Sequence, residues 1–80
     1  MYMGDKKMIR EMIGLRIKEL RLTKTNMSQN DFAKKIGIDR TYLSKIESGK
    51  HNITIDTIIK ICEALGVSLS VFFEPFNDFR

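Results

Sequence analysis

A short polar stretch in the middle of the chain carries side chains suited to hydrogen bonding with a nucleic acid. After Asp39, the apolar residues Leu43 and Ile46 share one face of a predicted helix. The outward positions that remain are basic or carry hydroxyl groups: Arg40, Thr41, Ser44 and Lys45. Arginine can pair through two hydrogen bonds with guanine O6 and N7, and threonine can offer its hydroxyl to a base or its methyl group to thymine. The chemistry available to this stretch is contact with base edges and phosphates.

The residue types that catalysis and metal binding need are scarce. The 80 residues include one histidine, His51, and one cysteine, Cys62. A single cysteine allows no internal disulfide and excludes a site built on two or four cysteines. The sequence also lacks a glycine-rich phosphate loop and a serine–histidine–aspartate set. We therefore expect no enzyme activity, no metal, no cofactor and no small-molecule ligand. Cys62 is interpreted as a small core residue.

Charge is distributed unevenly along the chain, whose net charge is +4. Residues 1–51 hold 12 lysines and arginines against 6 acids, an excess of +6, whereas residues 52–80 hold 2 against 4, a balance of −2. The first half is therefore a candidate for binding a polyanion, and the second is free for other contacts. No apolar run approaches the roughly 18 residues of a membrane span, and no export signal is visible. These features, together with the free cysteine, predict a cytoplasmic protein with no membrane partner.

Helix start and stop signals predict an all-α domain of five short helices. An apolar stripe with helical spacing places the first helix in residues 8–24, after a frayed start at residues 1–7. Side chains that can cap the four later helices are Ser28, Asp39, Thr54 and Ser68. Their expected ends are Gly37, Gly49, Gly66 and about Glu74. We expect one compact domain over residues 1–80 with its core in about 9–74, including inward positions for Ile55 and Leu69.

Residues 29–48 contain the residue types that a helix-turn-helix requires. Ala33 is small enough for two helices to cross closely, and Gly37, four positions later, can adopt the positive φ that the turn needs. The inward positions are filled by apolar side chains: Phe32, Ile36, Ile38, Leu43 and Ile46. An unrelated amphipathic helical hairpin would rarely fill all seven positions correctly. This pattern therefore strongly indicates a helix-turn-helix.

These residues resemble the Cro/repressor-type (XRE) helix-turn-helix family of prokaryotic and phage regulators. The resemblance rests on Ser28-Gln29, Phe32-Ala33, Gly37-Ile38, Tyr42-Leu43-Ser44, Ile46-Glu47 and Gly49, and it extends to residues 64–68 and 72–74. Within the family, residues 39–44, 46–47 and 52–54 are most similar to the controller proteins of restriction–modification systems. One departure is the loop of residues 24–27, which is one residue longer than usual and lacks the common glycine.

The resemblance implies that the third helix lies in the DNA major groove while the second crosses the backbone. Carried onto this sequence, it implies base or phosphate contacts from the outward residues of the third helix, Arg40, Thr41, Ser44 and Lys45. Gln29, at the start of the second helix, is the candidate for a further phosphate contact. Contacts with the DNA backbone are also open to the residues after the third helix, namely Ser48, Lys50, His51 and Asn52, for which an ordinary polar loop is the alternative interpretation. The Tyr42 ring is expected to pack at the core edge while its hydroxyl contacts a phosphate. Finally, the family pattern implies a structural ion pair between Arg21 and Glu47.

The end of the chain is unusually apolar, which points to self-association. Five large side chains fall within nine residues: Val71, Phe72, Phe73, Phe76 and Phe79. A thin five-helix core can absorb about two of these rings, and the others would form the kind of exposed patch that marks an interface. The resemblance likewise implies dimers joined through the last two helices. We expect a homodimer formed through Phe73, Phe76 and Val71, the alternative being a tail folded over its own core.

The leading hypothesis is a dimeric, sequence-specific transcriptional regulator that binds double-stranded operator DNA, with a restriction–modification operon as its candidate target. One alternative is an antitoxin that binds its own operator and also a toxin. Another is a protein-interaction module that has the fold without DNA binding. Arg40, Lys45 and the excess of +6 in residues 1–51 argue against this last alternative.

Overall fold

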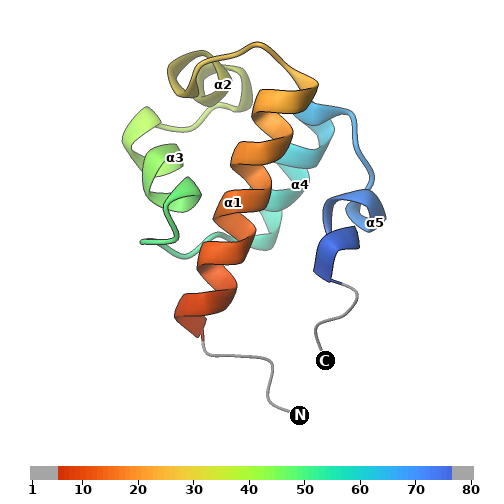
Figure 1. Cartoon of the computed structure of the whole chain (residues 1–80). Helices are drawn as coiled ribbons and strands as arrows, with labels where there is room; N and C mark the ends of the chain where they lie inside the picture. The colour runs from red at the N-terminus through yellow and green to blue at the C-terminus, as the bar shows by residue number, and fades with distance from the viewer. Residues whose placement is uncertain (1–5, 77–80) are drawn as a thin grey trace.

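The computed structural model describes residues 6–76, which fold into helices only. In order these are α1 (Lys6–Lys24), α2 (Gln29–Ile36), α3 (Arg40–Glu47), α4 (Ile55–Leu65), α5 (Leu69–Phe72) and a short 3₁₀ helix, η1 (Glu74–Phe76). The long helix α1 lies at the centre of Figure 1, with α2 and α3 on one side, α4 behind it and α5 on the other side. The predicted all-α fold of five α-helices is confirmed.

The four later α-helices begin at the caps that the sequence predicts. The hydroxyls of Ser28, Thr54 and Ser68 each accept a hydrogen bond from the N–H three residues later. The Asp39 carboxylate accepts one from the Thr41 N–H at the start of α3. Each cap satisfies an N–H group that has no partner inside its own helix. Three glycines adopt the expected left-handed conformation, with φ of 75°, 76° and 70° at Gly37, Gly49 and Gly66.

Two predicted helix boundaries are wrong. Helix α1 already begins at Lys6, so Lys6 and Lys7 are helical, while residues 1–5 lie outside the described part of the chain. The fifth helix ends at Phe72 rather than near Glu74. Pro75 explains the second difference, because proline has no N–H to donate to the carbonyl oxygen of Val71 four residues earlier. The chain tightens into the 3₁₀ helix η1, in which the Phe76 N–H donates to the Phe73 carbonyl at 2.9 Å.

Two apolar side chains expected to face inward are exposed instead. Ile55 is 68% exposed and Leu69 is 49% exposed. Each is the first residue of its helix, directly after the cap. The buried faces of these helices begin about one turn later, at Thr57 and Ile58 in α4 and at Phe72 in α5. The two side chains therefore enlarge the apolar surface of the C-terminal half rather than its core.

Each of the five α-helices contributes a fully buried side chain to one core, namely Ile17, Phe32, Leu43, Ile61 and Phe72. Burying a side chain of this size stabilises a fold by roughly 1.5–3 kcal/mol. Cys62 belongs to the same cluster, as predicted. Burial raises the pKa of its thiol above the ordinary value of 9.0, so the thiol stays protonated at neutral pH.

Helix α1 lies backbone to backbone against the end of α3. A methyl group on Gly14 would lie 2.6 Å from the Glu47 carbonyl oxygen, and one on Gly49 would lie 2.7 Å from the Glu11 Cα. No side chain fits at either place, so these two glycines allow the close approach. The position of α3 is therefore set directly by α1.

Candidate nucleic-acid interface

The outward face of α3 offers several donors with no partner of their own. Arg40, Thr41 and Lys45 are exposed and Ser44 is half-buried, whereas Leu43 and Ile46 on the other face are buried. Among the described residues, the side chains of Arg40, Thr41 and Lys45 form no hydrogen bond or ion pair. Their donors are consequently available to a ligand without breaking an internal contact.

A recess lies between the beginning of α2 and the beginning of α3. It has a volume of about 540 Å³ and is lined by Ser28, Gln29, Asn30 and Arg40. A guanidinium and the first backbone N–H groups of a helix are the groups that bind phosphate in proteins. The recess is thus suited to an anionic group such as a phosphate.

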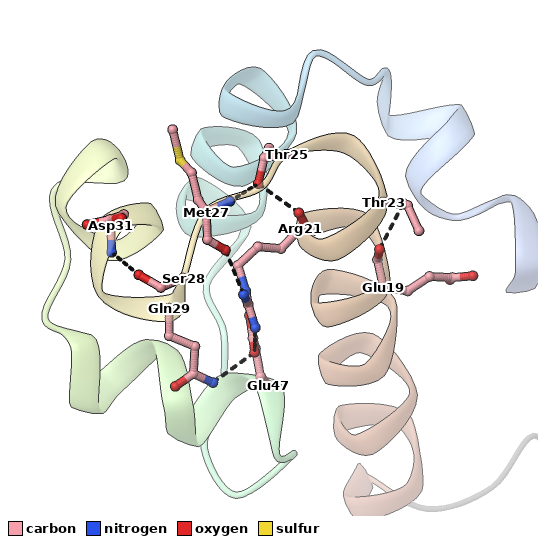
Figure 2. Close-up of polar contacts among 9 residues, drawn as sticks. All are labelled: Glu19, Arg21, Thr23, Thr25, Met27, Ser28, Gln29, Asp31 and Glu47. Atoms are coloured by element: carbon pink, nitrogen blue, oxygen red, sulfur yellow. Dashed lines mark hydrogen bonds and ion pairs between the residues drawn. The ribbon is translucent and has the colours of Figure 1, made fainter.

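A buried polar network fixes α3 from behind (Figure 2). The Arg21 Nε donates to Glu47 Oε2 at 2.8 Å, and its Nη2 donates to Glu47 Oε1 at 3.0 Å. The Gln29 Nε2 donates to the same Oε1 at 2.9 Å. Arg21 and Glu47 are both only 5% exposed. Two parallel bonds between a guanidinium and a carboxylate restrict geometry as well as neutralising charge. The network therefore joins α1, α2 and α3.

Gln29 has a role that the sequence did not reveal. It was predicted to contact a phosphate, and in the structure one of its amide hydrogens is used by Glu47. The second amide hydrogen remains available, so the phosphate contact stays a prediction. Gln29 and Glu47 are 18 positions apart, a separation at which no local sequence pattern indicates contact.

The loop between α1 and α2 follows a path that needs no glycine. The Thr25 N–H and its hydroxyl both donate to the Arg21 carbonyl, at 3.1 and 2.7 Å. The same hydroxyl accepts from the Met27 N–H at 3.0 Å, and the Met27 carbonyl accepts from Arg21 Nη1 at 2.9 Å (Figure 2). A threonine side chain thus satisfies the carbonyl at the end of the helix, where the family commonly has a glycine. The extra residue of the loop is absorbed without positive φ.

The loop between α3 and α4 brings together several of the predicted backbone contacts. Ser48, Lys50, His51 and Asn52 are all exposed. The half-buried Tyr42 donates its hydroxyl to the Asn52 carbonyl at 3.4 Å, and its ring packs edge to face on His51 with centroids 5.4 Å apart. Arg10 of α1 also donates to the Asn52 side-chain oxygen at 3.3 Å. The Tyr42 ring packs at the core edge, as predicted, whereas the contact of its hydroxyl with a phosphate stays a prediction.

The residues predicted to form the dimer interface differ in their exposure to solvent. Val71 is 41% exposed, whereas Phe73 and Phe76 are half-buried. The rings form an edge-to-face series, with centroids 4.8 Å apart for Phe72–Phe73 and 5.6 Å apart for Phe73–Phe76. Phe79 lies outside the described residues. Further exposed apolar side chains stand on the adjoining helices α4 and α5: Ile55, Ile59 and Leu69.

Residues 6–76 contain no candidate metal site and no candidate membrane-spanning helix. No group of three histidine, cysteine, aspartate or glutamate side chains in that range could hold a metal ion. No helix there is long and apolar enough to cross a bilayer.

The fold and this arrangement define a helix-turn-helix protein. The model of the helix-turn-helix family matches residues 17–72, and the chain belongs to that family. It is 45% identical over 64 residues to the control protein C.MunI of Mycoplasma sp, covering 80% of this chain and 86% of that protein. It is 46% identical over 59 residues to the control protein C.BamHI of Bacillus amyloliquefaciens, covering 74% and 73%.

A solved structure shares the fold with similar coverage. It is the restriction–modification controller protein C.Esp1396I, a tetramer in complex with its natural 35 base-pair operator. The TM-score is 0.76 with 40% sequence identity, covering 88% of this chain and 91% of that chain. The resemblance to controller proteins that the sequence indicates is confirmed.

Proposed function

We propose that the protein is a dimeric, sequence-specific transcriptional regulator that binds operator DNA through α3 and controls a restriction–modification operon. The observation that carries this proposal is the set of unpaired donors on α3, a helix fixed from behind by the buried Arg21–Glu47 pair. The family relationship supports it, because the relatives are control proteins and one of the related structures is bound to an operator.

The residues divide into two groups by the part of the duplex they meet. Arg40 and Thr41 lie in the first turn of α3, and with Ser44 and Lys45 they are assigned to base edges in the major groove. Backbone phosphates are assigned to Gln29, Tyr42, Ser48, Lys50, His51 and Asn52. For Tyr42 and Ser48 this contact requires the hydroxyl hydrogen to turn away from the Asn52 and Lys45 carbonyl oxygens. Phosphate contacts set the register of the protein on the duplex, and base contacts supply the sequence preference.

A homodimer explains how a domain with one recognition helix can bind a specific DNA sequence. One recognition helix covers about half a site, and two of them about 34 Å apart read a full operator. The proposed interface consists of the exposed Val71 and the half-buried Phe73 and Phe76. The exposed Ile55, Ile59 and Leu69 on α4 and α5 are proposed to extend it. Residues 52–80 carry a balance of −2, so this side does not compete for DNA.

The proposal includes one domain over residues 1–80, no catalytic activity and a place in the cytoplasm. Supporting observations are the single core shared by all five α-helices and the membership of a DNA-binding regulatory family.

Selection of bound duplexes from a random library, followed by titration at several salt concentrations, tests the function. A dimer that neutralises about 6–10 phosphates should lose roughly 10³–10⁵ in affinity between 50 and 200 mM salt. A selected pool without sequence preference, or binding that ignores salt, would contradict the proposal.

Sedimentation of charged variants tests the dimer. Ile59→Glu and Val71→Glu should each sediment as monomers at micromolar concentration, because both side chains are exposed and tolerate the change in the monomer. Leu22→Glu, on the exposed part of α1, is the matched control and should remain dimeric. Unchanged sedimentation of the first two variants would place the interface elsewhere.

A further inference from the structure

A second group of basic side chains lies beside the α3–α4 loop, on the first turns of α1. The loop that follows α3 passes beside the N-terminal half of α1, and the first turn of α1 extends beyond this loop (Figure 1). The Glu11 backbone packs directly on Gly49 of this loop, and Arg10 Nη1 donates to Asn52 Oδ1 at 3.3 Å. Lys6 and Lys7 occupy the turn before Arg10 and are exposed. Lys6 lies about 12 Å along the helix axis from Gly14, the point at which α1 meets α3.

The positive charge of this surface is not neutralised within the described chain. Among residues 6–76 the ion pairs are Arg16–Glu19 and Arg21–Glu47. Lys6, Lys7, Arg10 and Lys50 therefore have no acidic partner there. The nearest acids in the sequence are Asp5, which precedes Lys6 and lies outside the described residues, and Glu11, whose Cγ lies against the backbone of Gly49.

The contact between Arg10 and Asn52 determines which atoms the loop can offer. A guanidinium only donates hydrogen bonds, so the Asn52 side-chain oxygen must face Arg10. Its main-chain carbonyl accepts from the Tyr42 hydroxyl at 3.4 Å. Both Asn52 oxygens are thus occupied, and the amide Nδ2 remains as a donor. Together with the lysines, this makes a surface of donors, which complements phosphate oxygens.

We propose that the first two turns of α1 form a second contact with the DNA backbone, in which Lys6, Lys7 and Arg10 extend the phosphate contacts of the α3–α4 loop. The inference rests on the proposed DNA-binding function and enlarges its footprint. Its support is the charge of the surface and its continuity with the loop assigned to phosphates. A two-fold contact with a second copy is disfavoured, because the same basic patch would then face itself.

Matched pairs of charge-removing variants test the contact. Lys6→Gln with Lys7→Gln should flatten the slope of log K against log salt by about 0.9 for each phosphate that the variant no longer neutralises. Preference among single-base operator variants should stay within about twofold of the wild type, since phosphate contacts carry little sequence information. The control, Lys35→Gln with Lys60→Gln, removes the same charge from a recess between α2 and α4 and should keep the wild-type slope.

The Lys6→Gln and Lys7→Gln substitutions are not expected to disturb the fold. Lysines at the start of a helix oppose the helix dipole, so glutamine at positions 6 and 7 should leave the helix at least as stable. Circular dichroism of both variants checks this directly.

A double-mutant cycle tests the positioning role of Arg10. If Arg10 contributes partly by orienting Asn52, the fold-losses in affinity for Arg10→Ala and Asn52→Ala should not multiply in the double variant. Strictly multiplicative losses would overturn that part of the inference.

The outcomes also separate this inference from the proposed function. An unchanged salt slope for the Lys6/Lys7 variant, with Arg40→Ala still weakening binding and changing the base preference, would overturn the α1 contact alone. Weaker dimerisation with an unchanged slope would assign the surface to a second copy and overturn it as well. Absence of specific binding by the wild-type chain would remove the proposed function itself.

Discussion

Two arginines of α1 join it to different helices, Arg21 to α3 and Arg16 to α5, and they do so through different partners. Arg21 forms a bidentate pair with the Glu47 carboxylate, at the end of α3, in a site that is almost completely buried. Arg16, five residues earlier, donates from Nε to the Phe72 carbonyl at 2.8 Å and from Nη2 to the Val71 carbonyl at 2.7 Å. Arg21 is held by a buried carboxylate, whereas Arg16 is held mainly by two backbone oxygens and pairs with Glu19 only at the surface.

The difference reflects what each helix end has to do. The last carbonyl groups of a helix have no N–H partner within that helix. Pro75 also lacks the N–H that could donate to the Val71 carbonyl, so Arg16 satisfies backbone groups that are present whatever the side chains are. The Glu47 carboxylate needs one particular partner in one geometry. The α3 side is consequently fixed more specifically than the α5 side, as expected if α3 must present its donors at a defined angle.

Removing the acid from the buried pair should have the largest effect. Glu47→Ala leaves the Arg21 guanidinium buried without its counter-charge, which costs about 3–5 kcal/mol of unfolding free energy. Urea denaturation measures the loss. The double variant Arg21→Met with Glu47→Leu should recover part of it, because an apolar pair of similar volume avoids the charge penalty but leaves the Gln29 amide and the Met27 carbonyl without their partners. A loss below about 1 kcal/mol in the single variant would contradict a tightly fixed α3.

The contact at the other helix end should matter less. Arg16→Met keeps the aliphatic stem and leaves the Val71 and Phe72 carbonyls without their donors, for an expected loss of about 1.5–3 kcal/mol. Hydrogen exchange should accelerate in α5 more than in α3. The control is Glu19→Gln, which breaks only the exposed pair with Arg16 and should cost less than about 1 kcal/mol. Equal acceleration of hydrogen exchange in α3 and α5 would mean that these two helices are not held to α1 independently.

The smallest change is expected at the core cysteine. Cys62→Ala should fold and bind DNA normally, with a loss of about 1–2 kcal/mol from a small cavity. Burial raises the Cys62 pKa, so the stability that its thiol contributes is present below the ordinary value of 9.0 and lost as the pH rises through the folded-state pKa. The difference in stability between wild type and variant should therefore narrow above pH 9.0. Loss of DNA binding with the fold intact would give Cys62 a role that burial does not explain.

The features that could be predicted from the sequence are those with a local physical cause. Capping hydroxyls and left-handed glycines act within three or four residues, so the starts of four helices and the helix-turn-helix turn followed directly from the chain. The Arg21–Glu47 pair has no local signal, and only the family pattern indicated it. Even so, the third partner of that pair, Gln29, was missed.

Contacts that depend on the backbone of a distant segment could not be predicted. The bonds from Arg16 to carbonyls 55 and 56 residues away leave no mark on the sequence there. The need for glycine at position 14 arises only when α1 meets the last turn of α3. The exposure of Ile55 and Leu69 likewise depends on where each helix starts relative to the core.

The most direct test of the account is the base preference of an Arg40→Ala variant. Affinities for every single-base change in the selected operator would be compared between this variant and the wild type. If α3 reads bases and Arg40 pairs with a guanine, the variant should bind about 1–3 kcal/mol more weakly per half-site and lose its preference at one position only. Uniform weakening across all duplexes would assign Arg40 to a phosphate, and an unchanged profile would contradict the claim that the outward face of α3 reads the operator.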